Sequence, residues 1–84
     1  MPLYLVPMHA GIGSITRTTL KAEREARRYS TTARGYAVDA PDAATAFRAV
    51  LAAYNCRYAR AHFHHRSGVP ILAAEAALAA RLEA

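Results

Sequence analysis

GYAVDAPDAATAFRAVLAAY, residues 35–54, carries a strand pattern that changes directly into a helix pattern. Apolar residues first alternate with small or polar ones, which is typical of a half-buried strand: Tyr36, Val38, Ala40. They then recur at helical spacing: Ala43, Ala46, Phe47, Val50, Leu51, Tyr54. Pro41 suits the first helical position, and Asp42 suits the first turn, where the helix dipole favours a negative charge. We expect a strand over 31–39 and a helix over 41–54, with Phe47 central on its buried face.

The flanking sequence predicts four more elements: a strand over 3–8, a helix over 16–29, a strand over 56–65 and an alanine-rich helix over 71–82. Two of these assignments have alternatives. The start of the second element, Ile-Thr-Arg-Thr-Thr, is equally compatible with a strand, and residues 56–65 would also fit a continuation of the preceding helix. The expected fold class is α+β, a small, mostly antiparallel three-stranded sheet with two or three packed helices.

The chain has 84 residues, which predicts one domain spanning 1–84. Its hydrophobic fraction of 54% includes 21 alanines, which bury little apolar area each. A small core of this kind gains from association, so a homodimer is one expected arrangement. The single cysteine fits a reducing cytoplasm, and we expect neither a secretory leader nor a membrane span.

Positive charge is concentrated in the middle of the chain. The net charge is +5, and ten of the eleven lysines and arginines lie within residues 17–66. A basic region of this kind favours polyanions or an acidic protein surface. It also fits a surface that only keeps the protein soluble.

His62, His64 and His65, with Cys56 nearby, are the candidate metal ligands. Zinc needs three or four converging ligands, and this spacing matches no zinc signature. The sequence therefore predicts packed or exposed histidines, with no metal and no cofactor.

Enzymatic groups are also weakly represented. Cys56 has no carboxylate close in sequence to help activate it as a nucleophile, and the Gly11–Ser14 turn lacks the residues of a phosphate loop. Asp39 and Asp42 flank a helix start, where capping explains them. We therefore expect a protein without enzymatic activity.

Arginines interleaved with aromatic residues form the remaining candidate site. Such mixtures are favoured at both nucleic-acid and protein interfaces. The expected partner-binding residues are Arg27, Arg28, Arg34, Arg57, Tyr58, Arg60 and Arg66.

Two segments resemble small phage-encoded host-takeover proteins, including type I anti-CRISPR proteins. They are Tyr4-Leu5-Val6, and the strand Tyr36-Ala37-Val38-Asp39-Ala40 with the alanine-rich helix that follows it through Ala49. The resemblance implies a non-enzymatic inhibitor from a phage or mobile element. It would act in the bacterial host cytoplasm by binding a Cas protein or the crRNA-guided surveillance complex and blocking it sterically. Many members of this group are acidic and mimic DNA, whereas this chain is basic and would have to meet an acidic Cas surface or a nucleic-acid backbone.

Two other classes of function remain open at this point. One is a small basic nucleic-acid-binding or regulatory protein, and the other is an assembly module whose alanine-rich helix pairs with a second copy. Phosphate contacts would make binding steeply dependent on salt, which separates the first class from a protein inhibitor.

Overall fold

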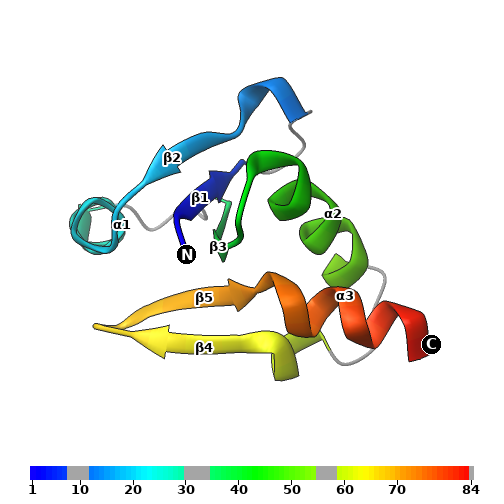
Figure 1. Cartoon of the computed structure of the whole chain (residues 1–84). Coiled ribbons are helices and arrows are strands. Elements are labelled where there is room, and N and C mark those ends of the chain that lie inside the picture. The colour runs from blue at the N-terminus through cyan, green and yellow to red at the C-terminus, as the bar shows by residue number, and fades with distance from the viewer. Residues whose placement is uncertain (8–11, 30–34, 55–58, 84) are drawn as a thin grey trace.

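The computed structural model describes residues 1–7, 12–29, 35–54 and 59–83, and it shows an α+β fold with helices on both faces of one sheet (Figure 1). In chain order the elements are β1 (Leu3–Val6), η1 (Ile12–Ser14), β2 (Thr16–Thr18), α1 (Leu20–Tyr29), β3 (Tyr36–Asp39), α2 (Ala43–Tyr54), η2 (Ala59–His62), β4 (Phe63–Arg66), β5 (Val69–Ala73) and α3 (Ala74–Glu83).

The sheet has five strands in the order β2-β1-β3-β5-β4. All neighbouring strands are antiparallel except β3 and β5, which run parallel with Val38 opposite Leu72. The predicted fold class is therefore confirmed as α+β, and the sheet is mostly antiparallel as expected, but it has five strands instead of three and includes the parallel pair β3–β5.

The two additional strands, β2 and β5, include residues that the pattern assigned to helices. Residues 16–18 form β2, the alternative left open for the Thr-rich segment, and α1 begins only at Leu20. Residues 71–73 belong to β5, so the final helix begins at Ala74. Ile71 is fully buried in the sheet, where a β-branched side chain packs well against its neighbours.

The segment predicted as a strand over 56–65 is only partly a strand. The chain forms the short helix η2 up to His62, and β4 occupies 63–66. Residues 56–58 lie outside the described part of the chain. β4 turns directly into β5 through Ser67 and Gly68, which both have positive φ, at 49° and 81°. Positive φ at both central residues is the geometry of a type I′ hairpin turn.

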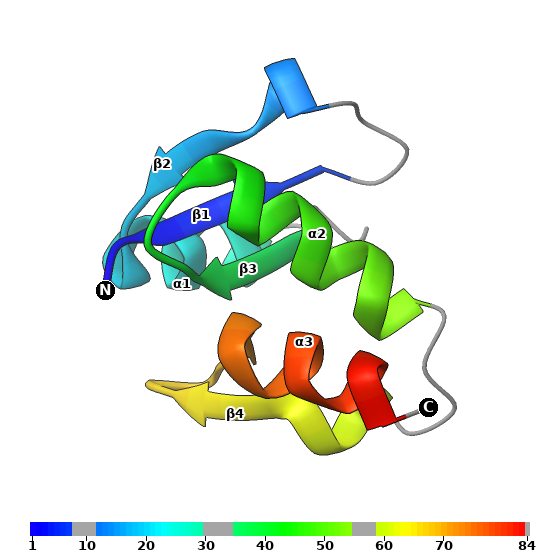
Figure 2. The same ribbon diagram turned by 45° about the vertical axis from the view of Figure 1, so that its right-hand side comes forward.

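The core is divided between the two faces of the sheet. In Figure 2, α2 and α3 lie in front of the sheet and α1 lies behind it. The front layer packs on Tyr4, Val6, Val38 and Leu72, and the back layer includes Leu20 against Leu3, Ala37, Val69 and Ile71. Because successive side chains of a strand point to opposite faces, β1 is buried along its whole length.

The buried face of α2 differs from the predicted one. Its buried residues are Ala46, Ala49, Ala52 and Ala53. Leu51 is 45% exposed and Tyr54 is 76% exposed, and Phe47 is only partly buried. Alanines allow α2 to lie close to α3, whose own buried residues include Ala74 and Ala77. The small residues of α2 therefore face the core, and its larger apolar residues are partly or mostly exposed to solvent.

Asp42 caps α2 from the position before the helix. The backbone N–H of Thr45 donates a 2.7 Å hydrogen bond to the Asp42 carboxylate, and the N–H of Ala46 donates to the Asp42 carbonyl at 3.1 Å. The helix thus begins two residues later than the sequence indicated. The hydrogen bonds from Thr45 hold the pKa of Asp42 below its ordinary value of 3.8.

Candidate functional site

Helix α1 supplies most of the site, and its sequence explains why it forms where it does. The Thr19 hydroxyl accepts a 3.1 Å hydrogen bond from the N–H of Ala22, which caps the first turn. Glu23, fully buried, faces the protein and accepts a 3.1 Å hydrogen bond from the Thr18 hydroxyl. Burial of Glu23 sets the rotation of the helix and leaves Arg24 and Arg28 exposed.

Arg27 joins α1 to the start of β3. Its Nη2 donates to the Gly35 carbonyl oxygen at 3.4 Å. Its Nε is buried and has no hydrogen-bond partner among the described residues. Gly35 has φ of +125°, and a Cβ there would lie 2.4 Å from the carbonyl oxygen of Val6, so only glycine fits at this contact.

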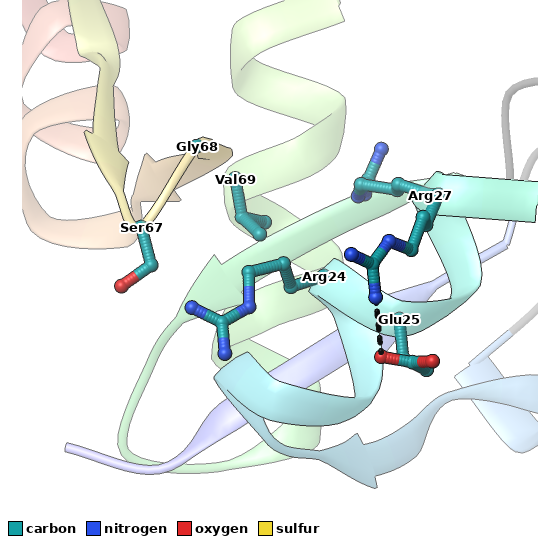
Figure 3. A pocket seen from close by; sticks show the side chains of 7 residues that line it. Arg24, Glu25, Arg27, Ser67, Gly68 and Val69 are labelled. Atoms are coloured by element: carbon teal, nitrogen blue, oxygen red, sulfur yellow. Dashed lines mark ion pairs between the residues drawn. The ribbon is translucent and has the colours of Figure 1, made fainter.

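A cleft of about 520 Å³ lies between α1 and the β4–β5 turn. We call it the arginine cleft, and its lining residues are Arg24, Glu25, Arg27, Arg28, Ser67, Gly68 and Val69. Figure 3 shows Arg24 reaching from α1 toward the turn that carries Ser67. Arg28 Nη1 lies 3.9 Å from Glu25 Oε2, and both side chains are mostly exposed, so this ion pair leaves the guanidinium accessible.

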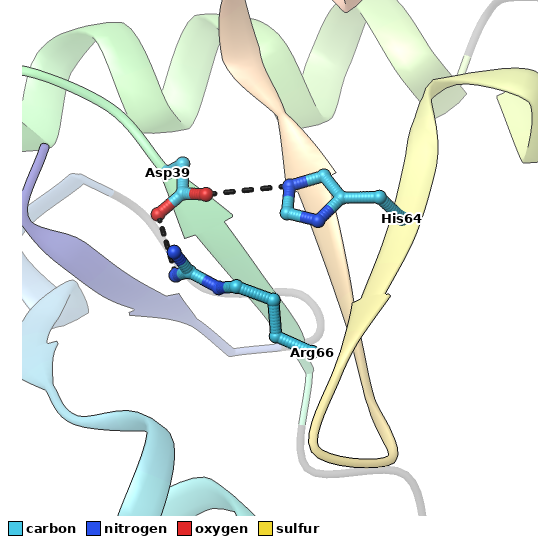
Figure 4. Close-up of polar contacts among 3 residues, drawn as sticks. All are labelled: Asp39, His64 and Arg66. Carbon is cyan, nitrogen blue, oxygen red and sulfur yellow. Dashed lines mark hydrogen bonds and ion pairs between the residues drawn. The ribbon is translucent and has the colours of Figure 1, made fainter.

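A second polar cluster joins β3 to β4 on the sheet (Figure 4). Asp39 contacts two residues of β4: Arg66 Nη2 at 3.1 Å and His64 Nε2 at 3.3 Å. The Asp39 side chain is 14% exposed, whereas those of His64 and Arg66 are 43% and 48% exposed. The cluster ties the edge strand β4 to β3 across β5, and it neutralises much of the charge of Arg66.

The structure brings together only part of the predicted binding residues. Arg27 and Arg28 line the arginine cleft, while Arg66 is engaged by Asp39. Arg34, Arg57 and Tyr58 lie outside the described residues, as does the side chain of Arg60.

Sequence reasoning missed Arg24, Glu25 and the turn residues of the cleft. The spacing of Arg24, Arg27 and Arg28 at i, i+3 and i+4 was a signal that these three share one helix face. No comparable signal linked this helix to Ser67 and Gly68.

The expected mixture of arginines with aromatic residues is not present around the described part of the cleft. Tyr36 and Phe63 form a tilted ring pair, with centroids 5.9 Å apart, and both pack against the core beneath α2 and α3. The cleft opens on the other side of the sheet, beside α1. The described residues therefore offer guanidinium groups there without an adjacent stacking surface.

Within the described residues, no group of three or more histidine, cysteine, aspartate or glutamate side chains is placed to hold a metal ion. His64 instead contacts Asp39, and Cys56 lies outside the described residues. None of the helices in the described ranges is long and apolar enough to cross a bilayer.

Comparison with known proteins adds no family to this description. No protein-family model, curated protein or solved structure matches the chain.

Proposed function

We propose that this chain is a non-enzymatic binding protein that holds the phosphate backbone of a nucleic acid in the arginine cleft. The observation that supports the proposal is that Arg24, Arg27 and Arg28 line one concave site, where Glu25 contributes the one carboxylate among the described lining residues. A guanidinium is always charged and presents paired donors that match phosphate oxygens.

The surroundings of the cleft favour contact with the backbone over readout of bases. Helix α1 has ten residues and is about 15 Å long, enough to follow a few phosphates of one strand. With Tyr36 and Phe63 on the other side of the sheet, base stacking contributes little at the described surface. Binding should therefore depend strongly on salt and only weakly on sequence.

Salt dependence tests this proposal quantitatively. Three arginine–phosphate contacts on a single strand predict a slope of about −2 for log K against log salt concentration, which is a loss of about sixteenfold between 50 and 200 mM salt. Fluorescence anisotropy with labelled 12-nucleotide poly-dT and poly-U measures it. A flat salt response, or a marked preference for one base composition, would contradict backbone binding.

A matched pair of variants tests whether nucleic acid binds in the arginine cleft. Arg24→Gln removes one charge from the cleft, and Arg48→Gln removes one from α2, where Arg48 is exposed and donates to the Thr45 hydroxyl. Both have the same net charge. We expect Arg24→Gln to weaken binding several-fold and Arg48→Gln to leave it nearly unchanged. Equal losses would mean that overall charge, and not the cleft, drives binding.

The inhibitory role implied by the sequence resemblance is a separate proposal, and it depends on that resemblance alone. It predicts that the purified protein captures a type I surveillance complex in a pull-down and lowers its binding of target DNA. If the contact is made through the arginine cleft to exposed crRNA, Arg24→Gln should impair capture more than Arg48→Gln.

A further inference from the structure

We infer that the arginine cleft is a binding site for a phosphate monoester, namely the 5′-phosphate at the end of a nucleic-acid strand. This inference rests on the proposed function, because it takes nucleic acid as the source of the phosphate. It adds that the end of the strand, and not its interior, is what the cleft recognises.

The hydrogen-bond donors in the cleft support a phosphate ligand. Arg27 lines the cleft, and its Nη2 donates to the Gly35 carbonyl, which fixes the guanidinium in place. A guanidinium held in this way loses little conformational freedom when it binds an anion. The Ser67 hydroxyl is a further donor across the cleft from α1.

The charge balance favours a terminal phosphate over an internal one. Among the described residues that line the cleft, three guanidinium groups face one carboxylate, which leaves a net charge of two positive units there. A phosphate monoester carries a charge of about −2 near neutral pH, whereas each internal phosphodiester carries only one negative charge.

The size of the cleft fits a phosphate attached to a larger group. A volume of about 520 Å³ falls in the range of small-molecule sites, of about 300 to 1,000 Å³, and exceeds what a single phosphate needs. The terminal sugar and part of its base would occupy the remaining space between α1 and the turn.

The test compares two 12-nucleotide single strands of the same sequence, labelled at the 3′ end and carrying either a 5′-phosphate or a 5′-hydroxyl. For the wild-type protein at 50 mM salt we expect about tenfold tighter binding of the phosphorylated strand, since charge-assisted hydrogen bonds to a dianion are the strong ones. Arg24→Gln and Arg27→Gln should reduce this ratio to near one, and Arg48→Gln should preserve it. Arg27→Gln also removes a contact between α1 and the start of β3. If that variant does not fold, the binding ratio of Arg24→Gln decides the test.

Removing the carboxylate that opposes the arginines should raise the affinity ratio of the two strands, whereas removing an arginine should lower it. Glu25→Gln should increase the preference for the 5′-phosphate, because it leaves the cleft with three uncompensated guanidinium groups. Glu75→Gln is the control, since Glu75 lies on α3 on the opposite side of the sheet and makes the same change in net charge. An unchanged ratio in Glu25→Gln would contradict the charge balance proposed for the cleft.

The remaining outcomes separate this inference from the proposed function. Equal, salt-sensitive binding of both strands by the wild type overturns the inference of a 5′-phosphate site and remains consistent with binding of the nucleic-acid backbone. No binding of either strand overturns the proposed function, and with it the source of phosphate named here. A phosphoserine peptide that binds more tightly than the phosphorylated strand overturns the assignment to a nucleic-acid end.

Discussion

Truncating one side chain in each of two elements tests the core of this fold. Leu72 is fully buried in β5, between Val38 of β3 and Phe63 of β4. Phe47 on α2 is only partly buried, although its position in the sequence made it the expected core residue of that helix. We predict that Leu72→Ala destabilises the protein much more than Phe47→Ala, even though the second change removes more atoms.

The magnitudes follow from burial. A fully buried leucine truncated to alanine costs about 2 to 5 kcal/mol, because the apolar surface is lost and a cavity remains. Phe47→Ala removes a partly exposed ring and leaves no enclosed cavity, so about 1 kcal/mol is expected. A domain of this size has a total stability of about 4 to 13 kcal/mol, and about 1 kcal/mol shifts its melting temperature by roughly 4 to 8 °C.

Urea and thermal unfolding followed by circular dichroism measure both variants. The expected result is a drop in melting temperature of at least about 10 °C for Leu72→Ala and a drop of less than about 8 °C for Phe47→Ala. A cost of about 3 to 5 kcal/mol for Phe47→Ala, equal to or above that of Leu72→Ala, would support the buried helix face expected from the sequence, with Phe47 at its centre. It would refute the packing of α2 through its alanines.

Three further substitutions test local geometry. Gly35→Ala should cost more than about 1 kcal/mol, because the new Cβ would lie 2.4 Å from the Val6 carbonyl oxygen and φ is +125°; an unchanged urea midpoint would contradict this contact. Ser67→Asn should raise stability by up to about 1 kcal/mol, since φ of 49° suits asparagine better than serine; a lower melting temperature would argue against the type I′ turn. Asp42→Ala should lower the melting temperature at pH 7. Because the pKa of Asp42 is lowered in the folded state, this contribution is complete above 3.8 and disappears as pH falls through the folded-state pKa, so wild type and variant should converge in acid. A constant difference down to pH 2 would show that the carboxylate charge is not involved.

The sequence was informative where a periodic pattern lies within one element. The strand around Val38 and the helix after Asp42 are both present in the structure, as is the turn at Gly68, although β3 is buried on both faces and not half-buried as the alternation indicated. β5 was missed because Pro70 reads as a breaker and the strand runs directly into the alanine-rich helix α3.

The orientation of α2 could not be predicted by placing its largest apolar residues inward. Close helix packing rewards small side chains, and Ala49 is buried while Tyr54 is exposed. The arginine cleft was not predictable either, because its two walls are far apart in the sequence. Residues 24–28 and 67–69 meet only through the strand order of the sheet.

The parallel pairing of β3 with β5 also has a consequence for the order of folding. The β4–β5 hairpin joins residues that are neighbours in the chain, so it forms with little loss of loop entropy. The contact between Ala37 and Ile71 closes a long loop, and such non-local pairings form slowly. The hairpin and α1 would therefore become adjacent only after β3 has paired with β5. Appearance of the arginine cleft would then mark completion of the native sheet, and refolding monitored by anion binding should lag behind refolding monitored by helix content.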